Sequence, residues 1–251
     1  MFVILSEAKD LDKINSFRDS SAYGLRMTII KEKTMLTIFG FDFSSPSNKV
    51  RFAANAMGIP YEYKQVNLLA GEQKTPEFLK LNPVGRVPAI DDNGFKVFES
   101  AAIIKYLADK NNSPLYPKDL QKRTIVDQWI DFANIHVSAA LARVTFNRVM
   151  YKMLNVEKDE RSLADGIKFL GNFLPAIEKQ LKENKYLAGN DMTLADINLL
   201  AVLDPAEMSS VDLSVYPSIY NWRKNLKTQA FYKKCHNSLE EVFQAAMAVG
   251  K

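Results

Sequence analysis

Two short motifs carry residue types that could hold a peptide. Val87-Pro88 lies at the start of a short predicted strand. Because proline cannot donate to a ladder, this dipeptide should be a sheet edge, a strand start or a tight turn, and it is compatible with a cis bond. A cis bond there would leave the backbone N–H and C=O of Val87 free to pair with an extended peptide. The second motif, Glu99-Ser100, precedes an apolar run and predicts a helix start, whose free N–H groups suit a carboxylate.

Hydroxyl side chains lie further upstream, in a loop ahead of another predicted helix. The segment Ser44-Ser45-Pro46-Ser47 contains three serines and no cysteine. A hydroxyl placed before a helix N-terminus can stabilise a bound anion. The alternative is that these serines only form turns and a helix cap. Ser47 directly precedes the first expected helical residue, Asn48, and is therefore the expected cap.

The elements that must position these motifs alternate along the first half of the chain. Composition and period predict strands at 36–40 and 61–68, helices at 48–57, 76–81 and 99–110, and a hairpin of 88–91 and 95–98 across Asp92-Asn93-Gly94. With a proline before the third strand, this order predicts a thioredoxin-like α/β domain over residues 35–111.

The second half of the chain shows no strand pattern. After a linker at 112–119, rich in Pro and Asn, helical periods occur at 120–153, 159–184, 194–203, 217–228 and 238–249, which predicts an all-helical domain over residues 120–251. Asp204-Pro205 should end or bend the third of these helices. Thr193 and Asp196 have the spacing of a capping box, which indicates a role in folding rather than in substrate contact.

These motifs resemble the cytosolic glutathione transferase family. The match runs from about Met35 to the C-terminus, and it becomes specific where Val87-Pro88 is followed by Glu99-Ser100. The resemblance implies a serine-type enzyme of a bacterial kind, with an N-terminal domain like those of the phi, theta and delta classes. It also implies a homodimer, and glutathione as a co-substrate with no resident cofactor.

The chemistry that this resemblance implies uses the thiol of glutathione. Ser44 matches the serine of the serine-type members, six residues before Val50, so it is the preferred thiolate partner, with Ser47 and Ser45 as alternatives. A neutral hydroxyl that donates to sulfur lowers the thiol pKa from about 8.5 without itself being deprotonated. Because serines stand where thioredoxins carry two cysteines, the domain cannot cycle a disulfide of its own.

The same residue-by-residue comparison implies the rest of the tripeptide site. Val87, before Pro88, would pair with the cysteinyl backbone, and Glu99 and Ser100 would hold the γ-glutamyl end. The glycyl carboxylate would meet or lie beside Gln73, Lys74 and Arg86. For Lys74 and Arg86 an equal alternative is that both side chains are solvated and make no contact with the ligand. Gln73 stands where many relatives have histidine, and Ala101 where many have arginine, and both departures weaken the expected contacts.

The second substrate, a hydrophobic electrophile, is expected where the first long C-terminal helix faces Ser44. Helical steps of three and four put several side chains of this segment on one face. The candidates are Phe43, Phe132, His136, Arg143, and with them Ala139, Phe146 and Tyr151. For each aromatic residue the alternative is a place in the core, and His136 is more simply explained as a satisfied interdomain histidine.

Composition removes several other classes of protein. One cysteine, Cys235, excludes a disulfide framework, and two histidines exclude a multi-histidine metal site and disfavour a Ser-His triad. The net charge of +4 is small and dispersed, so no nucleic-acid surface is expected. No run is long enough to span a bilayer and no signal peptide is evident, so a cytoplasmic protein without membrane contact is predicted.

Two questions stay open from the sequence. Residues 1–34 show no sustained period and could be a disordered tail, an added surface segment or upstream sequence included by a misplaced start. Residues 3–11 resemble a translated intergenic bacterial repeat, which favours the misplaced start.

The favoured function is glutathione conjugation. The alternatives are a non-catalytic stress or regulatory interaction protein of the same fold, and a glutathione-dependent peroxidase or dehalogenase.

Overall fold

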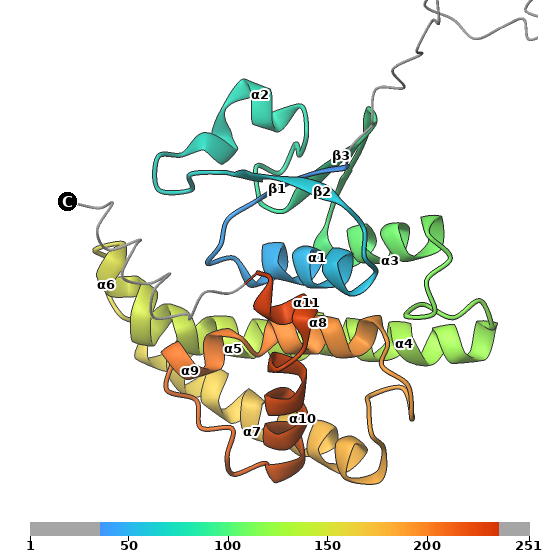
Figure 1. Ribbon diagram of the computed structural model, residues 1–251. Coiled ribbons are helices and arrows are strands. Elements are labelled where there is room, and N and C mark those ends of the chain that lie inside the picture. Colours follow the sequence, from blue (N-terminus) through green and yellow to red (C-terminus); the bar gives the residue numbers. More distant parts are fainter. Residues whose placement is uncertain (1–35, 236–251) are drawn as a thin grey trace, which may run out of the picture. The chain divides into compact units, whose positions relative to one another are not determined.

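The computed structural model describes residues 36–235, and its first half is built on a four-stranded mixed sheet. The strand order is β2-β1-β3-β4, with β1 parallel to β2, and antiparallel pairs β1–β3 and β3–β4. This is the predicted thioredoxin-like arrangement (Figure 1). The elements are β1 (Leu36–Gly40), α1 (Ser45–Ala56), β2 (Tyr61–Gln65), η2 (Glu72–Lys74), α2 (Pro76–Leu79), β3 (Ala89–Asp92), β4 (Phe95–Phe98) and α3 (Ser100–Lys110).

Helix α1 begins three residues earlier than predicted, and this changes which serine caps it. Ser44 is the N-cap, and its Oγ accepts a hydrogen bond from the N–H of Ser47 at 3.3 Å. Ser47 lies inside the helix and is fully buried, so the prediction that Ser47 is the cap was wrong. The physical reason is Pro46, which was interpreted as part of a loop but is compatible with the first helical turn, where its missing N–H needs no partner.

The hairpin of β3 and β4 follows the local turn chemistry. Asn93 and Gly94 have φ values of 57° and 90°, which is the positive φ at both central residues that a type I′ turn requires. The Val87–Pro88 peptide bond is cis, as expected, and β3 begins at the next residue, Ala89. β3 runs through the centre of the domain core, with Ala89 and Ile90 fully buried.

The second half of the described chain is helical, but the long helix predicted over 120–153 is not uniform. Two π-helical segments interrupt it, and each adds a residue to a turn and so shifts the side chains that follow around the helix. The elements are α4 (Leu120–Phe132), η3 (Ala133–Val137), α5 (Ser138–Thr145), η4 (Phe146–Met150), α6 (Tyr151–Met153), α7 (Glu160–Glu183), α8 (Leu194–Val202), α9 (Pro205–Met208), α10 (Pro217–Lys227) and α11 (Ala230–Lys233).

Helix α8 is the centre of the helical half, because every one of its residues is buried. The predicted capping box is confirmed: Thr193 and Asp196 exchange side-chain and backbone hydrogen bonds at its start. The Asp196 carboxylate also accepts from the N–H of Leu187 at 3.0 Å and from Nε1 of Trp222 at 3.1 Å. Because these bonds hold the start of a fully buried helix, the Thr193 motif has the folding role expected of it. At its other end, α8 stops before Asp204-Pro205, as predicted.

The two halves meet where α1 packs against α8. In Figure 1, α1 and α3 lie between the sheet and the helices of the second half, and α2 lies beyond the other face of the sheet. The hydroxyl of Ser45 donates to the backbone carbonyl of Ala201, which joins the start of α1 to α8 directly. Residues 1–34 and the helix predicted at 238–249 lie outside the described residues. Among the described helices, none has the length and apolar character that a membrane crossing requires.

Candidate functional site

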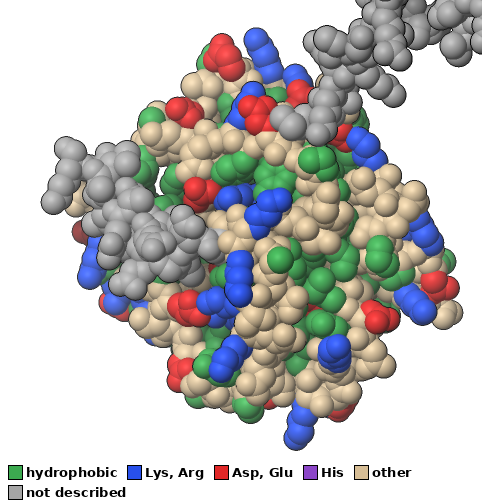
Figure 2. Space-filling model, viewed as in Figure 1, with side chains coloured by type: hydrophobic (Ala, Val, Ile, Leu, Met, Phe, Trp, Pro, Cys, Tyr) green, Lys and Arg blue, Asp and Glu red, His purple; other side chains and the backbone are tan. Residues whose placement is uncertain are grey.

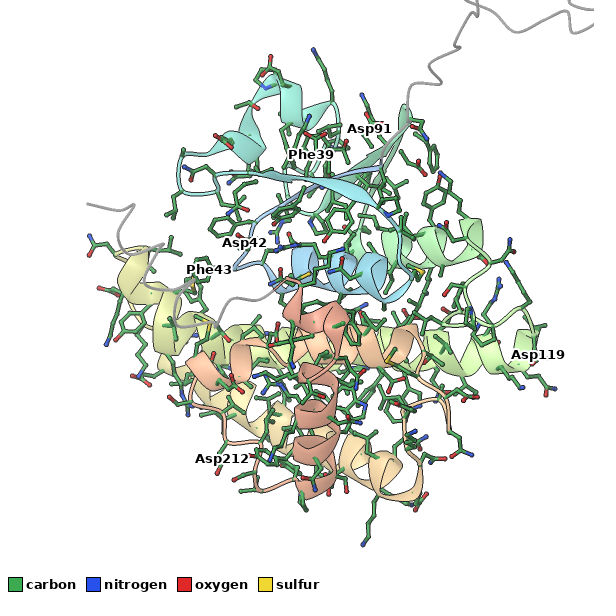
Figure 3. All side chains as sticks on the ribbon, viewed as in Figure 1. Phe39, Asp42, Phe43, Asp91, Asp119 and Asp212 are labelled. Atoms are coloured by element: carbon green, nitrogen blue, oxygen red, sulfur yellow. The ribbon has the colours of Figure 1, made fainter. Side chains whose placement is uncertain are left out.

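The loop that carries Ser44 is fixed by side chains of the helix that follows it. The backbone N–H of Ser44 donates to the carbonyl of Phe41 at 2.8 Å, which closes a tight turn. Asn48 Nδ2 donates to the Asp42 carbonyl at 2.8 Å, and Arg51 Nη1 lies 2.6 Å from Asp42 Oδ1. Asp42 and Phe43 project from this loop in Figure 3. The N-terminus of α1 and its cap are therefore held in one position before any ligand arrives.

The hydroxyl groups of the three serines of this loop differ in hydrogen bonding and in burial. The Ser45 hydroxyl donates its hydrogen bond to the backbone carbonyl of Ala201. Ser47 is fully buried, and its Oγ accepts from the N–H of Phe41 at 3.2 Å. Ser44 is partly buried and its Oγ accepts only from the N–H of Ser47, so within the described residues its own O–H has no acceptor. Ser44 is the serine that can donate a hydrogen bond outward.

Val87 presents an unpaired backbone next to the buried Pro88. Within the described part of the chain, neither the N–H nor the C=O of Val87 has a hydrogen-bond partner. The preceding loop is packed closely against η2: a Cβ on Gly85, whose φ is 64°, would lie 2.8 Å from the carbonyl oxygen of Gln73. Because the N–H and C=O of Val87 are unpaired, they are available for the strand-like pairing predicted from the sequence.

The polar residues predicted at the glycyl end lie around the same loop. The exposed Lys74 donates from Nζ to the Val84 carbonyl at 3.2 Å, and Gln73 Nε2 lies 3.5 Å from the Leu68 carbonyl. Arg86 is exposed, and its backbone carbonyl accepts from Asn82 Nδ2 at 2.6 Å. Gln73, Lys74 and Arg86 are thus close to Val87 in the fold, and their contact with a ligand stays a prediction.

The start of α3 has an unusual backbone conformation. Glu99, its N-cap, has φ 69° and ψ 108°, and its side chain makes no capping bond. Positive φ in a non-glycine residue costs free energy and is concentrated at functional sites. Because no side chain caps this helix, the N–H groups of its first turn are free to meet a carboxylate. Ser100 is the first helical residue and is only partly buried.

A lysine that the sequence analysis did not identify lies beneath Ser100. Lys49 of α1 is 3% exposed, and its Nζ donates to Ser100 Oγ at 3.1 Å and to Asn134 Oδ1 of η3 at 2.9 Å. Burial lowers the pKa of Lys49 to about 8, although the negative charge of Glu99 works in the opposite direction. A sequence signal existed: Lys49 precedes Phe52 and Ala53 by three and four residues and so shares their buried helix face.

The residues predicted to line the electrophile site fall into two groups. Phe132 and the exposed His136 pack on Phe173 of α7, with ring centroids 6.0 and 5.1 Å from the Phe173 ring. Arg143 is exposed, with Nη1 3.4 Å from Ser162 Oγ. Arg143 lies after the π-helical turn of η3, which displaces the side chains that follow it from the face of Phe132. The same holds for the other residues of this helix named with it: Ala139, Phe146 and Tyr151.

Phe43 has different neighbours from these. Its ring packs on Phe41, with centroids 5.6 Å apart. It also borders a small pocket beside Ser44 that is formed with the turn between α8 and α9. This pocket has a volume of about 20 Å³, and its lining residues are Asp42, Phe43, Ser45, Asn48, Asp204, Pro205 and Met208. Within the described residues, no ring contact or hydrogen bond joins Phe43 to Phe132, His136 or Arg143, and the electrophile role of all four stays a prediction.

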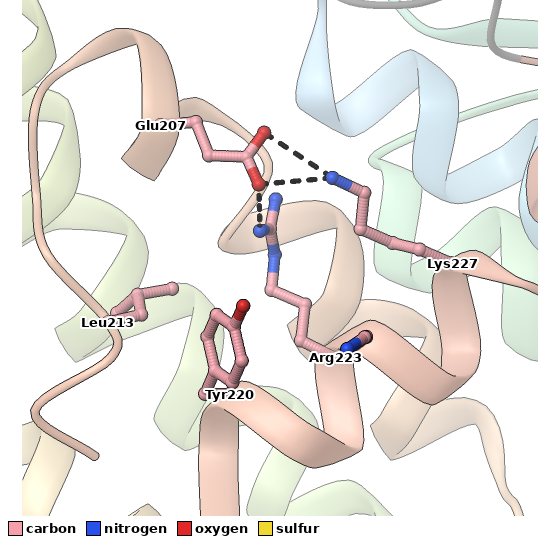
Figure 4. Close-up of a pocket in the computed structure, with 6 residues that line it drawn as sticks. Glu207, Leu213, Tyr220, Arg223 and Lys227 are labelled. Atoms are coloured by element: carbon pink, nitrogen blue, oxygen red, sulfur yellow. Dashed lines mark hydrogen bonds and ion pairs between the residues drawn. The ribbon is translucent and has the colours of Figure 1, made fainter. Parts of the chain in front are cut away.

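A larger pocket, of about 240 Å³, lies between α9 and α10 and is lined by Glu207, Leu213, Tyr220, Arg223, Lys224 and Lys227. Figure 4 shows the Glu207 carboxylate between Arg223 Nη1, at 2.6 Å, and Lys227 Nζ, at 3.0 Å. Burial favours the neutral carboxyl, but the bonds to Arg223 and Lys227 outweigh it and hold the pKa of Glu207 below its usual value. This ion cluster ties α9 to α10 and contains none of the predicted site residues.

Three further features of the described part of the chain concern metal ligands, surface charge and the single cysteine. No group of three or more His, Cys, Asp or Glu side chains among the described residues could hold a metal ion. On the face drawn in Figure 2, basic and acidic side chains lie interspersed, as expected for a small and dispersed net charge. Cys235 is packed, with Sγ 2.9 Å from Asn55 Nδ2, and burial raises the pKa of its thiol.

Comparison with known proteins places the chain in a family. The model of the glutathione S-transferase N-terminal domain matches residues 34–109, and that of the glutathione S-transferase C-terminal domain matches residues 137–230. Glutathione S-transferase D7 of Drosophila melanogaster is 32% identical over 193 residues, which are 76% of this chain and 83% of the relative. The chain belongs to the glutathione S-transferase family.

Solved structures agree with the sequence comparison. A delta-class glutathione transferase of Nilaparvata lugens superimposes with a TM-score of 0.72 at 32% identity, covering 84% of this chain and 99% of that one. A glutathione S-transferase I bound with lactoylglutathione gives a TM-score of 0.74 at 30% identity, covering 80% and 98% of the two chains. The expected fold, a thioredoxin-like domain followed by the family's helical domain, and the expected class of activity, glutathione transfer, are confirmed.

Proposed function

We propose that this protein is a serine-type glutathione transferase in which the Ser44 hydroxyl stabilises the thiolate of bound glutathione. The observation that carries the proposal is that the three serine hydroxyls differ in hydrogen bonding and burial: the Ser45 hydroxyl donates its hydrogen bond to the Ala201 carbonyl, and Ser47 is fully buried. Ser44 accepts from the α1 backbone and keeps its own O–H to donate. The dipole at the N-terminus of α1 adds a favourable field for an anion at the same place.

The tripeptide is held at three points in this proposal. The unpaired N–H and C=O of Val87 pair with the cysteinyl residue, and the uncapped N-terminus of α3 at Ser100 receives the γ-glutamyl carboxylate. Glu99 accepts from the γ-glutamyl ammonium. Lys74 and Arg86, on the exposed side of the loop, and Gln73 lie towards the glycyl carboxylate. These contacts place the sulfur beside Ser44.

The reaction then needs little further chemistry from the protein. The Ser44 O–H donates to the sulfur, which lowers the thiol pKa from about 8.5 and raises the fraction of thiolate at neutral pH. The thiolate attacks the electrophile and a C–S bond forms. A leaving group departs with its bonding pair, or, where the substrate has none, the electron pair of the attacked double bond moves to the neighbouring atom and takes up a proton from solvent. The electrophile lies on the Phe43 side of the loop, with Phe132, His136 and Arg143 as further candidate contacts. The active protein is a homodimer in this proposal.

The thiolate absorbance of bound glutathione, followed against pH, tests the role of Ser44. In the wild-type protein we expect the thiol to titrate below its pKa in free glutathione, and in Ser44→Ala to titrate close to it. Turnover of an aryl halide should fall by about 10- to 1,000-fold, the range for loss of one such donor. Ser45→Ala is the matched control, because it removes a neighbouring hydroxyl that is already committed to Ala201.

Two results would count against the proposal. If Ser44→Ala kept the wild-type thiol pKa and turnover, the thiolate partner would be another group. If calorimetry with millimolar reduced glutathione gave no saturable heat, the chain would be a non-catalytic member of the family, such as an interaction protein of the same fold.

A further inference from the structure

The buried ammonium of Lys49 has no counter-ion within the described part of the protein. Its two recorded partners, Ser100 Oγ and Asn134 Oδ1, are neutral oxygens. No carboxylate oxygen of a described residue lies within 4.0 Å of Nζ. A charge that is taken out of water without a partner is strongly unfavourable, and proteins normally pair it or neutralise it. Here the charge persists, because the pKa of Lys49, lowered by burial to about 8, still leaves it mostly protonated at neutral pH.

The position of Lys49 indicates what its missing partner is. Ser100 Oγ lies at the start of α3, whose first N–H groups have no side-chain cap. The next residue, Ala101, brings no charge to this helix start. Lys49 therefore places a buried cation directly against the start of α3, where an anion would bind. Glu99 is exposed at the rim and its negative charge acts on Lys49, but it lies outside ion-pair distance.

The hydrogen bond between Lys49 and Ser100 also fixes the direction of the serine hydroxyl. A lysine ammonium can only donate, so the Ser100 oxygen must be the acceptor. The Ser100 O–H is then left to donate elsewhere, and a donor polarised by a cation makes a stronger bond to a carboxylate. Asn134, which is carried on the π-helical segment η3, holds Nζ from the other side.

We propose that Lys49 is a positioning residue whose missing counter-ion is the α-carboxylate of the γ-glutamyl end of glutathione, reached through Ser100. This deepens the proposed function and rests on it. Lys49 itself stays beneath the site, and the Ser100 hydroxyl and the first N–H groups of α3 touch the ligand. The charge of Lys49 makes the site selective for a peptide that carries a free α-carboxylate at that end.

The test compares two ligands across four proteins. The ligands are glutathione and γ-aminobutyryl-cysteinyl-glycine, which lacks only the α-carboxylate of the γ-glutamyl residue and keeps its ammonium group. The proteins are the wild type, Lys49→Met, Lys49→Gln, and the control Lys64→Met, which removes an exposed lysine of β2 whose Nζ lies 3.7 Å from Glu62. Lys49→Gln keeps a donor for Ser100 without the charge, so it provides a second variant if the methionine does not fold. Dissociation constants come from calorimetry, with circular dichroism as the check of folding.

We expect both Lys49 variants to bind glutathione about 10- to 100-fold more weakly, the range for a charge-assisted contact. The same variants should bind the analogue as the wild type does, within a few-fold, because that ligand lacks the α-carboxylate that Lys49 is proposed to balance. In steady-state assays KM for glutathione should rise with little change in kcat. Lys64→Met should match the wild type with both ligands.

The outcomes separate this inference from the proposed function. If the wild type bound neither ligand, glutathione binding itself would be refuted and the role of Lys49 with it. If the wild type bound glutathione and the Lys49 variants lost both ligands equally, Lys49 would act on the structure of the site and the inference would be overturned. Unchanged glutathione affinity in either folded variant would overturn it as well.

Discussion

The buried charge of Lys49 predicts a specific dependence of stability on pH. Its side chain is 3% exposed, and burial, opposed by the charge of Glu99, lowers its pKa from 10.5 to about 8. In the unfolded chain the pKa returns to the ordinary lysine value. Between about pH 8 and 10.5 the unfolded state therefore binds more protons than the folded state, and the free energy of unfolding rises with pH.

The size of this effect follows from the shift. Each unit of pKa difference corresponds to about 1.4 kcal/mol. A shift from 10.5 to about 8 therefore makes the folded protein about 3 kcal/mol more stable at the top of the window than at neutral pH. Below about pH 8 both states carry the charge, and the full cost of burying it is present. Lys49→Met removes the titrating group and should remove this slope.

Urea denaturation followed by tryptophan fluorescence, at intervals between pH 7 and 10.5, measures the effect. Other groups also titrate in this range, so the informative quantity is the difference in free energy of unfolding between Lys49→Met and the wild type. We expect that difference to move by about 3 kcal/mol in favour of the wild type as the pH rises. Lys64→Met, an exposed lysine variant, should stay parallel to the wild type. Parallel curves for Lys49→Met and the wild type would refute the argument that Lys49 is a buried, charged group.

Three further predictions concern stability. Ser44→Ala should lower the free energy of unfolding by about 1 kcal/mol through loss of the α1 cap, whereas Ser44→Gly should lower it by only a few tenths, although turnover falls alike in both. Equal melting temperatures for the two variants would contradict the capping role. Asp196→Asn should cost about 1–3 kcal/mol in urea denaturation, because donors from Leu187, Thr193 and Trp222 converge on this buried carboxyl group and an amide would leave one of them without an acceptor. Gly94→Ala should destabilise by about 1 kcal/mol, because φ is 90° there. Gly171→Ala, with open space around its Cβ inside α7, should stabilise by about 0.5–1 kcal/mol; the same sign for both glycine variants would refute this reasoning.

Local chemistry in the sequence was sufficient for the architecture. The turn at Asn93-Gly94 and the capping box of Thr193 and Asp196 form as predicted, and the Val87–Pro88 bond is cis, which is one of the arrangements with which the sequence is compatible. Each depends on residues close together in the chain, and each residue type has a narrow conformational preference. The order of strands and helices follows from these signals and from hydrophobic periodicity.

Errors occurred where a local signal had two interpretations. Proline is compatible both with loops and with a first helical turn, so the sequence around Pro46 predicts a cap at Ser47, whereas the structure has it at Ser44. The helix predicted over 120–153 contains two π-helical segments, which hydrophobic periodicity does not reveal. Both cases change which side chains face the site.

The sequence by itself determined the fold, and through Ser44, Val87, Glu99 and Ser100 it determined the residues proposed to hold glutathione. Only the tertiary structure decided the hydrogen bonding and the burial of these groups. The bond from Ser45 to Ala201 spans the two halves of the chain, and so does that from Lys49 to Asn134. Burial and hydrogen bonding, which set whether a hydroxyl can donate and whether an ammonium has a counter-ion, arise from residues that are distant in sequence and meet only when the halves pack.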